Sequence, residues 1–236
     1  MPLPSGARAP FTSSVETLVT IETRSRPVSA LLLEADHPVA AYVLAHGAGA
    51  GIRHSFMAEV ATALAAAGVT TLRYQFPYME AGTRRPDAPA VAVATVRAAV
   101  ARARELLPDL PLVAGGKSFG GRMTSTAAAE LALEGVGGLV FLGFPLHPPK
   151  RPAITRGDHL DRVTVPMLFL QGTRDDLADL GLIRTVCGRL GATATLHEVA
   201  EANHGFEVPK RTGQTHADII LALAQTAAAW IKGVAG

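Results

Sequence analysis

Residues 112–123 read Leu-Val-Ala-Gly-Gly-Lys-Ser-Phe-Gly-Gly-Arg-Met. An apolar run ends in two glycines, a serine follows between small residues, and a helical pattern begins. Gly116, Ser118 and Gly120 fit G-x-S-x-G, the pattern of a sharp strand-to-helix turn that exposes a serine. Glycines suit this turn because strand and helix pass close together and the turn is strained. The stretch therefore predicts a strand, a turn and a helix, with Ser118 as a candidate nucleophile on the turn.

The same residues allow two other interpretations. Gly116-Lys117-Ser118 resembles the end of a phosphate-binding P-loop, G-x-x-x-x-G-K-[ST]. That motif needs a glycine at position 111, where the chain has Pro111, and strand-like residues fill the interval. The P-loop is therefore disfavoured. A glycine-rich turn without chemistry stays open at this point.

The composition is that of a folded protein. The chain has 236 residues, 48% hydrophobic and 18% charged, enough to bury roughly 70–75% of its unfolded surface. A net charge of +2 gives no electrostatic reason to expect nucleic-acid binding. The single Cys187 cannot form an intramolecular disulfide and fits a reducing compartment. Residues 1–8 lack the apolar segment of a signal peptide, and no apolar run approaches 18 residues. We therefore expect a cytoplasmic protein without a membrane partner.

Apolar runs and helical patterns alternate along the chain. Residues 1–14 are rich in Pro, Ser, Gly and Ala and predict a loose tail, and residues 15–236 are expected to form one domain. Two short β-like runs predict an antiparallel hairpin at one sheet edge. The later alternation implies right-handed crossovers and a mostly parallel sheet with helices on both faces. The expected strands cover 15–22, 28–34, 39–45, 69–76, 112–116, 138–144, 165–171 and 193–199; the expected helices cover 54–67, 88–107, 119–133, 177–190 and 215–231; 76–87 is a polar loop and 145–156 an irregular, proline-rich one.

In such a sheet the functional site lies beyond the carboxyl ends of the parallel strands. Ser118 follows one of these ends. Asp175 lies in the loop after the strand at 165–171, and His204 lies in the loop after the strand at 193–199. A serine nucleophile needs a base, and the base needs an orienting acid. These side chains are therefore expected to converge, and their order, Ser then Asp then His, is the α/β-hydrolase order.

The acid and the base both have rival candidates. Asp175 could instead cap the helix that follows it. Asp176 is the better placed cap, and Asp179 is expected inside that helix, so Asp175 is preferred as the acid. Among other histidines, His197 falls within a strand and His216 lies near the start of the final helix. The histidine after the last strand is therefore preferred as the base.

A second glycine cluster follows the first parallel strand. Residues 46–51 read His-Gly-Ala-Gly-Ala-Gly. A dinucleotide fingerprint, G-x-G-x-x-G, would need glycine at Ile52, and no acidic residue ends the next strand to hold a ribose. A plain turn is possible. We prefer a third interpretation, because a loop of small residues can aim N–H groups at a developing negative charge, and its His-Gly start resembles the loops of esterases and lipases.

Five stretches together resemble one family: HGAGAG, FPYME, GGKSFGGRM, LQGTRD and NHGF. From the first parallel strand to its C-terminus, the chain is similar to small, lid-poor α/β-hydrolases near the dienelactone hydrolases, and more narrowly to predicted bacterial hydrolases that share these stretches. The resemblance implies Ser118 as nucleophile, Asp175 as orienting acid and His204 as general base. It also implies an oxyanion hole made by the backbone N–H groups of Phe119 and Ala48. Dienelactone hydrolases proper use a cysteine nucleophile, so their substrate does not transfer to this chain.

These roles predict a serine hydrolase of the α/β-hydrolase fold. It would cleave a small-molecule ester or thioester through an acyl-enzyme on Ser118, as carboxylesterases and thioesterases do, with no metal or organic cofactor. A non-catalytic α/β-hydrolase domain for binding or scaffolding stays open, as does a serine peptidase or acyltransferase with the same triad. Only about 20 residues separate Gly143 from Val165. We therefore expect no helical cap domain and an open site.

Substrate contacts are expected from the loops at the same sheet edge. The candidates are Gly49, Tyr78, Arg84, Arg122 and Phe206. Tyr78 and Phe206 would line an acyl pocket. Arg84 and Arg122 belong to a group of basic side chains in these loops, which is either a solvated basic surface or a site for substrates that carry a negative charge.

Overall fold

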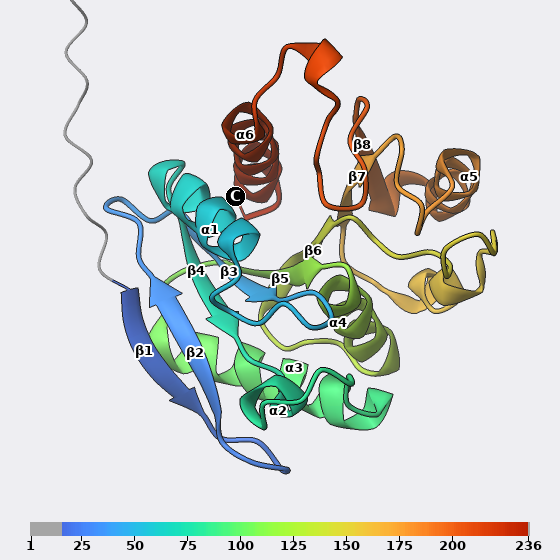
Figure 1. The fold of residues 1–236 in the computed structure, drawn as a ribbon. Helices are drawn as coiled ribbons and strands as arrows, with labels where there is room; N and C mark the ends of the chain where they lie inside the picture. The colour runs from blue at the N-terminus through green and yellow to red at the C-terminus, as the bar shows by residue number, and fades with distance from the viewer. Residues whose placement is uncertain (1–15, 236) are drawn as a thin grey trace, which may run out of the picture.

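The structure, a computed structural model, describes residues 16–235; the predicted loose tail at 1–14 lies outside them. Within the described residues, eight strands form one sheet in the order β1-β2-β4-β3-β5-β6-β7-β8 (Figure 1). The strands are β1 (Glu16–Ile21), β2 (Val28–Leu33), β3 (Ala40–Ala45), β4 (Val69–Tyr74), β5 (Leu112–Lys117), β6 (Val136–Leu142), β7 (Met167–Gly172) and β8 (Ala194–Val199). β2 is antiparallel to both β1 and β4, and the other neighbouring strands are parallel. The predicted mostly parallel sheet with an antiparallel N-terminal edge is confirmed.

Helices cover both faces of this sheet (Figure 1). The longer helices are α1 (Ser55–Ala66), α3 (Pro89–Leu106), α4 (Phe119–Glu130), α5 (Leu180–Leu190) and α6 (His216–Ala235). α3, α4 and α5 share one apolar core with the sheet, and α1 and α6 share a second core on the other face. Every residue of β3 is buried, which explains its unbroken apolar sequence, because a central parallel strand is covered on both sides.

Two connections decide how open the sheet edge is. The segment between β6 and β7 forms only two short 3-10 helices, Thr155–Gly157 and Leu160–Arg162, and carries no large cap, as the sequence predicted. The predicted polar loop at 76–87 differs, because it begins with a short helix, α2 (Pro77–Glu80). Proline at the first helical position explains this helix, since its fixed φ suits a first turn and its missing N–H is not needed there.

Helix α6 differs from the expectation that no apolar stretch is long enough to span a membrane. By length and composition alone, its segment at 216–234 is long and apolar enough, with a mean hydropathy of 1.3. The helix is, however, amphipathic in its packing. Ile219, Leu223 and Ala227 are buried in the core that α6 shares with α1 and the sheet. We therefore interpret α6 as a helix that packs on the core of the domain.

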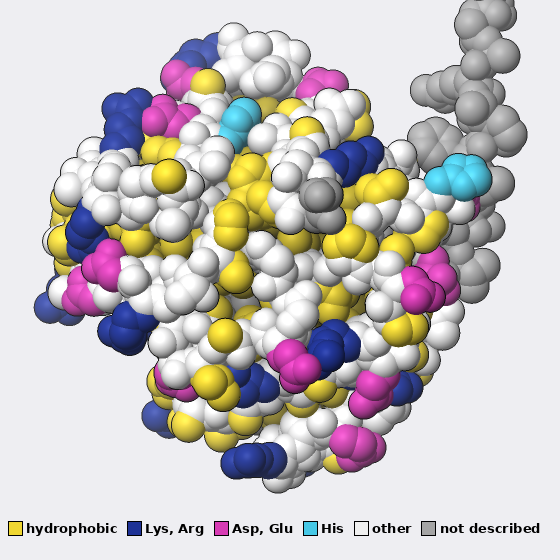
Figure 2. Space-filling model, turned by 180° about the vertical axis from the view of Figure 1, so that it is seen from behind, with side chains coloured by type: hydrophobic (Ala, Val, Ile, Leu, Met, Phe, Trp, Pro, Cys, Tyr) yellow, Lys and Arg dark blue, Asp and Glu magenta, His cyan; other side chains and the backbone are white. Residues whose placement is uncertain are grey.

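Charged side chains of both signs surround the face drawn in Figure 2, and hydrophobic side chains gather toward its centre. Lys and Arg side chains are interspersed with Asp and Glu side chains over this face. Mixed signs at short spacing leave no extended field of one sign there.

A buried arginine ties the hairpin edge to the body of the sheet. The Arg73 side chain on β4 is 1% exposed and forms an ion pair with Glu16 of β1. Its Nη1 also donates to the Ile52 carbonyl at 3.0 Å. Burial lowers the pKa of Arg73, as expected when a charged group leaves water. Glu16 is therefore the countercharge that makes this burial tolerable.

We expect Glu16→Gln to destabilise the protein by about 2 kcal/mol, because it leaves the buried Arg73 charge without its partner. Urea unfolding of the two proteins measures the difference. Glu22→Gln is the matched control, since Glu22 is exposed just beyond β1, and it should change stability by less than about 0.5 kcal/mol. Equal effects of the two substitutions would contradict this account of Arg73.

Candidate active site

Ser118 lies on a sharp turn between β5 and α4. Its φ of 49° and ψ of −115° are rare for a residue with a side chain. The turn passes so close to the end of β3 that only glycine fits beside it. A Cβ on Gly116 would lie 2.2 Å from the Ala45 carbonyl oxygen, and one on Gly120 would lie 2.6 Å from the Ala45 Cβ and from the His46 carbonyl oxygen. The two glycines of the sequence pattern are therefore required by contact with β3.

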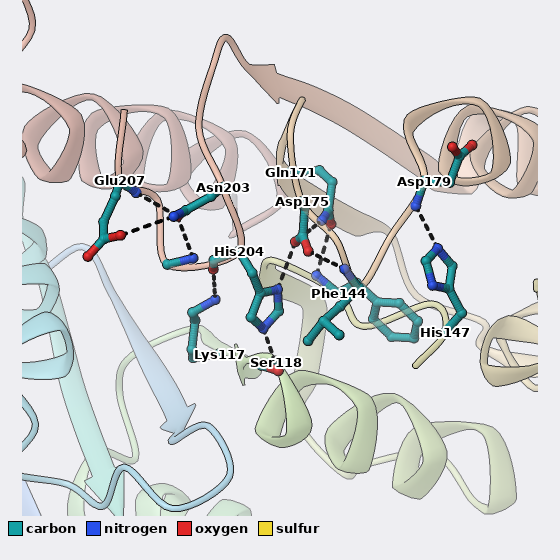
Figure 3. Close-up of polar contacts among 12 residues, drawn as sticks. Lys117, Ser118, Phe144, His147, Gln171, Asp175, Asp179, Asn203, His204 and Glu207 are labelled. Atoms are coloured by element: carbon teal, nitrogen blue, oxygen red, sulfur yellow. Dashed lines mark hydrogen bonds and ion pairs between the residues drawn. The ribbon is translucent and has the colours of Figure 1, made fainter. Parts of the chain in front are cut away.

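His204 lies between Ser118 and Asp175 (Figure 3). Its Nε2 is 2.9 Å from the Ser118 Oγ, and its Nδ1 is 2.8 Å from the Asp175 Oδ2. Because a carboxylate only accepts, the Nδ1 carries the proton, which leaves the Nε2 lone pair directed at the serine hydroxyl. The three side chains that the sequence placed at separate strand ends are thus in one hydrogen-bonded line.

Asp175 is held from both sides. Its side chain is fully buried. Its Oδ1 accepts from the Leu177 amide at 2.8 Å, and its Oδ2 accepts from the Gln171 Nε2 at 2.5 Å. The Gln171 side chain also accepts from the Phe144 amide at 2.9 Å. The carboxylate therefore has a fixed orientation toward the histidine.

The helix-cap interpretation of these acids was wrong in its details. α5 begins at Leu180, and Asp179 is its N-cap, with its Oδ1 accepting from the Leu182 amide at 3.0 Å. Asp179 is therefore not inside the helix, and Asp176 does not cap it. The start is later than predicted because the Asp179 amide is itself bound by the His147 Nε2 at 2.8 Å, which fixes the chain before the helix.

The acid loop and the histidine loop are bonded to one another. The Arg174 amide donates to the Ala202 carbonyl at 2.9 Å, and the Glu201 amide donates to the Thr173 Oγ1 at 2.8 Å. A Cβ on Gly172 would lie 2.4 Å from the Ala202 carbonyl oxygen. These contacts fix the separation of the two loops, and with it the Asp175–His204 distance.

The loop at 46–51 lies beside the serine. Ala48 lines the same cavity as Ser118, and a Cβ on Gly47 would lie 3.8 Å from the Ser118 Cβ. Phe119 is the first residue of α4, where amide hydrogens have no acceptor within the helix. Of the two amides that the resemblance implies for an oxyanion hole, that of Phe119 follows the serine in the chain, and that of Ala48 belongs to a residue lining the same cavity.

His46 holds this loop in place, a role that the sequence analysis missed. Its ring is fully buried; the Nδ1 lies 2.7 Å from the Gly47 carbonyl, and the Nε2 accepts from the Phe76 amide at 3.1 Å. Burial lowers the pKa of His46 to about 4, so the ring is neutral and can accept and donate at once. The His-Gly start of the loop was the available signal in the sequence.

A cavity of about 330 Å³ opens beside Ser118. Its walls are mostly apolar, and the sequence analysis had not proposed those that come from α1. The lining residues are Gly47, Ala48, Ala50, His54, Phe56, Met57, Lys117, Ser118, Leu177, His204 and Gly205. Phe56 and Met57, which come from α1, could not be read from the sequence because α1 reaches this edge only through its packing on the sheet.

None of the five candidate substrate contacts is among the residues that line this cavity. The Tyr78 hydroxyl accepts from the Gly49 amide at 3.0 Å, so both residues support the loop. Phe206 is buried and stacks on Phe56, with ring centroids 5.8 Å apart. The Arg122 guanidinium carbon lies 6.0 Å from the centroid of the Phe119 ring, and Arg84 is exposed.

A metal site is not visible in the described part of the chain. Among residues 16–235 there is no group of three His, Cys, Asp or Glu side chains that could hold a metal ion.

Comparison with known proteins gives the family. A family model described as an alpha/beta hydrolase domain matches residues 38–232. The chain belongs to the alpha/beta hydrolase domain family. This alpha/beta hydrolase domain is similar in fold to several solved structures. The dienelactone hydrolase from Anabaena variabilis is 21% identical, with a TM-score of 0.75, and the match covers 94% of this chain and 99% of that one.

Two further structures share the fold of this alpha/beta hydrolase domain. One is a serine hydrolase without a lid from Xanthomonas campestris, 20% identical, with a TM-score of 0.72 and coverage of 94% and 98%. The other is the esterase domain of a Rhodothermus marinus protein, 16% identical, with a TM-score of 0.71 and coverage of 94% and 100%. The absence of a lid in the Xanthomonas protein matches the short segment between β6 and β7 here.

We expect Gly120→Ala to destabilise this alpha/beta hydrolase domain by roughly 2–4 kcal/mol, because its Cβ would meet backbone and side-chain atoms of β3. Chemical denaturation measures the loss. Gly188→Ala is the matched control within a helix: nothing lies within 4 Å of its added Cβ, and it should stabilise by roughly 0.5–1 kcal/mol. If Gly120→Ala is as stable as the unaltered protein, the close approach at the turn is not required.

Proposed function

We propose that this chain is a serine hydrolase that cleaves a small ester or thioester through an acyl-enzyme on Ser118. One observation carries the proposal: the Ser118 Oγ, the His204 ring and the buried Asp175 carboxylate form one line of hydrogen bonds, beside an apolar cavity. The esterase and hydrolase structures that share the fold support the same reaction class.

Acylation uses each group in turn. The Ser118 Oγ attacks the substrate carbonyl while the His204 Nε2 takes its proton, and Asp175 stabilises the imidazolium that forms. The carbonyl oxygen becomes negative and is received by the amides of Phe119 and Ala48; one such donor is typically worth about 3–4 kcal/mol. The tetrahedral intermediate then collapses. His204 returns the proton to the leaving alcohol or thiol, and the acyl group stays on Ser118.

Deacylation repeats the sequence with water. His204 takes a proton from a water molecule, whose oxygen attacks the acyl carbonyl, and the second tetrahedral intermediate is held by the same amides. Its collapse releases the acid, and the proton returns to the Ser118 Oγ. Atoms and charge balance without a metal ion or an organic cofactor.

The cavity walls support a proposal for the substrate class. Ala48, Ala50, Phe56, Met57 and Leu177 give an apolar surface next to the reacting oxygen. A volume of about 330 Å³ suits a small acyl group. We propose that uncharged acyl groups of small size are preferred.

The reactivity of Ser118 is tested with a fluorophosphonate probe. We expect the unaltered protein to be labelled and Ser118→Ala to lose labelling, because only a serine activated by a base attacks phosphorus readily. Ser125→Ala is the matched control: Ser125 also contacts a histidine, His159, at 2.7 Å, but is fully buried. It should keep labelling.

Two results would contradict the proposal. Folded, unaltered protein that is not labelled would leave a non-catalytic binding domain as the better interpretation. Labelling that persists in Ser118→Ala would place the reactive group elsewhere. With labelling established, a panel of esters, thioesters, peptides and acyl acceptors separates an esterase from a peptidase or acyltransferase.

We expect Asp175→Asn to lower kcat by about 10³–10⁴-fold, because an amide donor opposite the Nδ1 favours the wrong imidazole tautomer. Steady-state kinetics on a short-chain ester measures the loss. Asp176→Asn is the control at the neighbouring, exposed position, and should change kcat by less than about threefold. A larger loss for Asp176→Asn than for Asp175→Asn would show that the acid was assigned to the wrong residue.

A further inference from the structure

Lys117 directly precedes Ser118 in the chain, and its side chain has a different partner from the Ser118 hydroxyl. The sequence suggested a P-loop lysine here, an interpretation that the chain does not support. In the structure the Lys117 Nζ donates to the main-chain carbonyl of His204 (Figure 3). Two consecutive residues therefore hold the same histidine. The Lys117 side chain binds the main chain of His204, and the Ser118 hydroxyl binds its ring.

The ammonium group also lies close to the Asp175–His204 pair. A point beside Gly143, where a Cβ would stand, is 3.0 Å from the Lys117 Nζ, 3.5 Å from the Asp175 Oδ2 and 3.6 Å from the His204 Cε1. Three polar or charged groups thus converge on one small space. Glycine at this position keeps that space free of a side chain.

Aromatic rings complete the surroundings of the ammonium. The Nζ is 5.0 Å from the Phe206 ring centroid and 5.7 Å from that of Phe56. These distances are within the range of cation–π attraction. Phe206 has a positive φ of 62°, which is uncommon for a bulky residue, so the histidine loop adopts strained backbone to bring its ring here.

The Lys117 side chain is half-buried, so its charge is partly removed from water. Desolvation lowers the pKa of Lys117 to about 8, and the charge of Asp175 acts in the opposite direction. The group is still largely protonated at pH 7. A charge retained in such surroundings needs a compensating interaction, which the His204 carbonyl and the Asp175 carboxylate supply.

We propose that Lys117 is a positioning residue for the reaction proposed above, on which this inference rests. Its ammonium group fixes the main chain of His204, so that the ring reaches both Ser118 and Asp175. Its positive charge lies close to the Asp175 carboxylate that orients the ring. The other titratable group in the cavity is His54, at the N-cap of α1.

Two substitutions separate the bond from the charge. Lys117→Gln keeps a donor for the His204 carbonyl but removes the charge, and Lys117→Met removes both. We expect Lys117→Met to lower kcat at least about tenfold with KM within about twofold, because a displaced base slows chemistry more than binding. Because Lys117→Gln keeps a donor, we expect it to retain kcat within about threefold of the unaltered protein.

Lys210→Met is the matched control, since Lys210 is exposed on the same loop as His204; it should keep the unaltered kcat and KM. Thermal melts show which variants are folded, and if Lys117→Met is not, Lys117→Gln decides by its kcat. An unchanged kcat in folded Lys117→Met, or a tenfold loss in folded Lys117→Gln, overturns the proposal. Failure of the serine hydrolase proposal is a different result, because the unaltered protein would then show no esterase activity and no probe labelling.

Discussion

At the end of β5 the main chain passes β3 with no room for a Cβ atom at Gly116 or Gly120. This close approach puts Ser118 on a turn that neither a strand nor a helix would allow, with a positive φ. It also sets α4 to begin beside the loop that follows β3. The serine, the free amide at the start of α4 and the small-residue loop are therefore neighbours through one contact between two strands, and the remaining groups of the site are added to this centre.

The site also shows how buried charge is compensated. Asp175 is fully buried, yet its oxygens meet an amide N–H, a glutamine amide and the histidine ring. Lys117 adds a positive charge close by. Each of these groups would be unfavourable alone in a region with little water. Together they form a network in which each orientation is fixed by a neighbour, which is the condition for holding a base within reach of a nucleophile.

Main-chain regularities made much of the fold readable from the sequence. Alternating apolar runs and helical patterns placed the strand ends, and a parallel sheet brings its carboxyl ends to one edge, so Ser118, Asp175 and His204 could be grouped in advance. Side-chain directions were not readable in the same way. Tyr78 supports Gly49 instead of facing the cavity, and Phe206 packs on Phe56. These outcomes depend on contacts between segments far apart in the chain, which local pattern does not encode.

The first residue of a helix was also hard to predict, because it depends on which of several acidic side chains accepts a hydrogen bond from the first helical amides. The sequence offered three aspartates before α5, and the bond from the Asp179 amide to His147 selected the third. Likewise the cavity walls from α1 follow from how that helix packs on the sheet. A local motif can predict a candidate cap or nucleophile. The partners that decide between the candidates belong to other segments of the chain.

The short connection between β6 and β7 has a kinetic consequence. With two 3-10 helices there instead of a cap domain, a substrate would reach the serine without waiting for a lid to open, and a product would leave by the same path. Lid opening limits turnover in many enzymes, and such movement slows as the viscosity of the solvent rises. For the hydrolysis proposed above, the bond-making and bond-breaking steps would then limit the rate, and kcat would be insensitive to added viscogen.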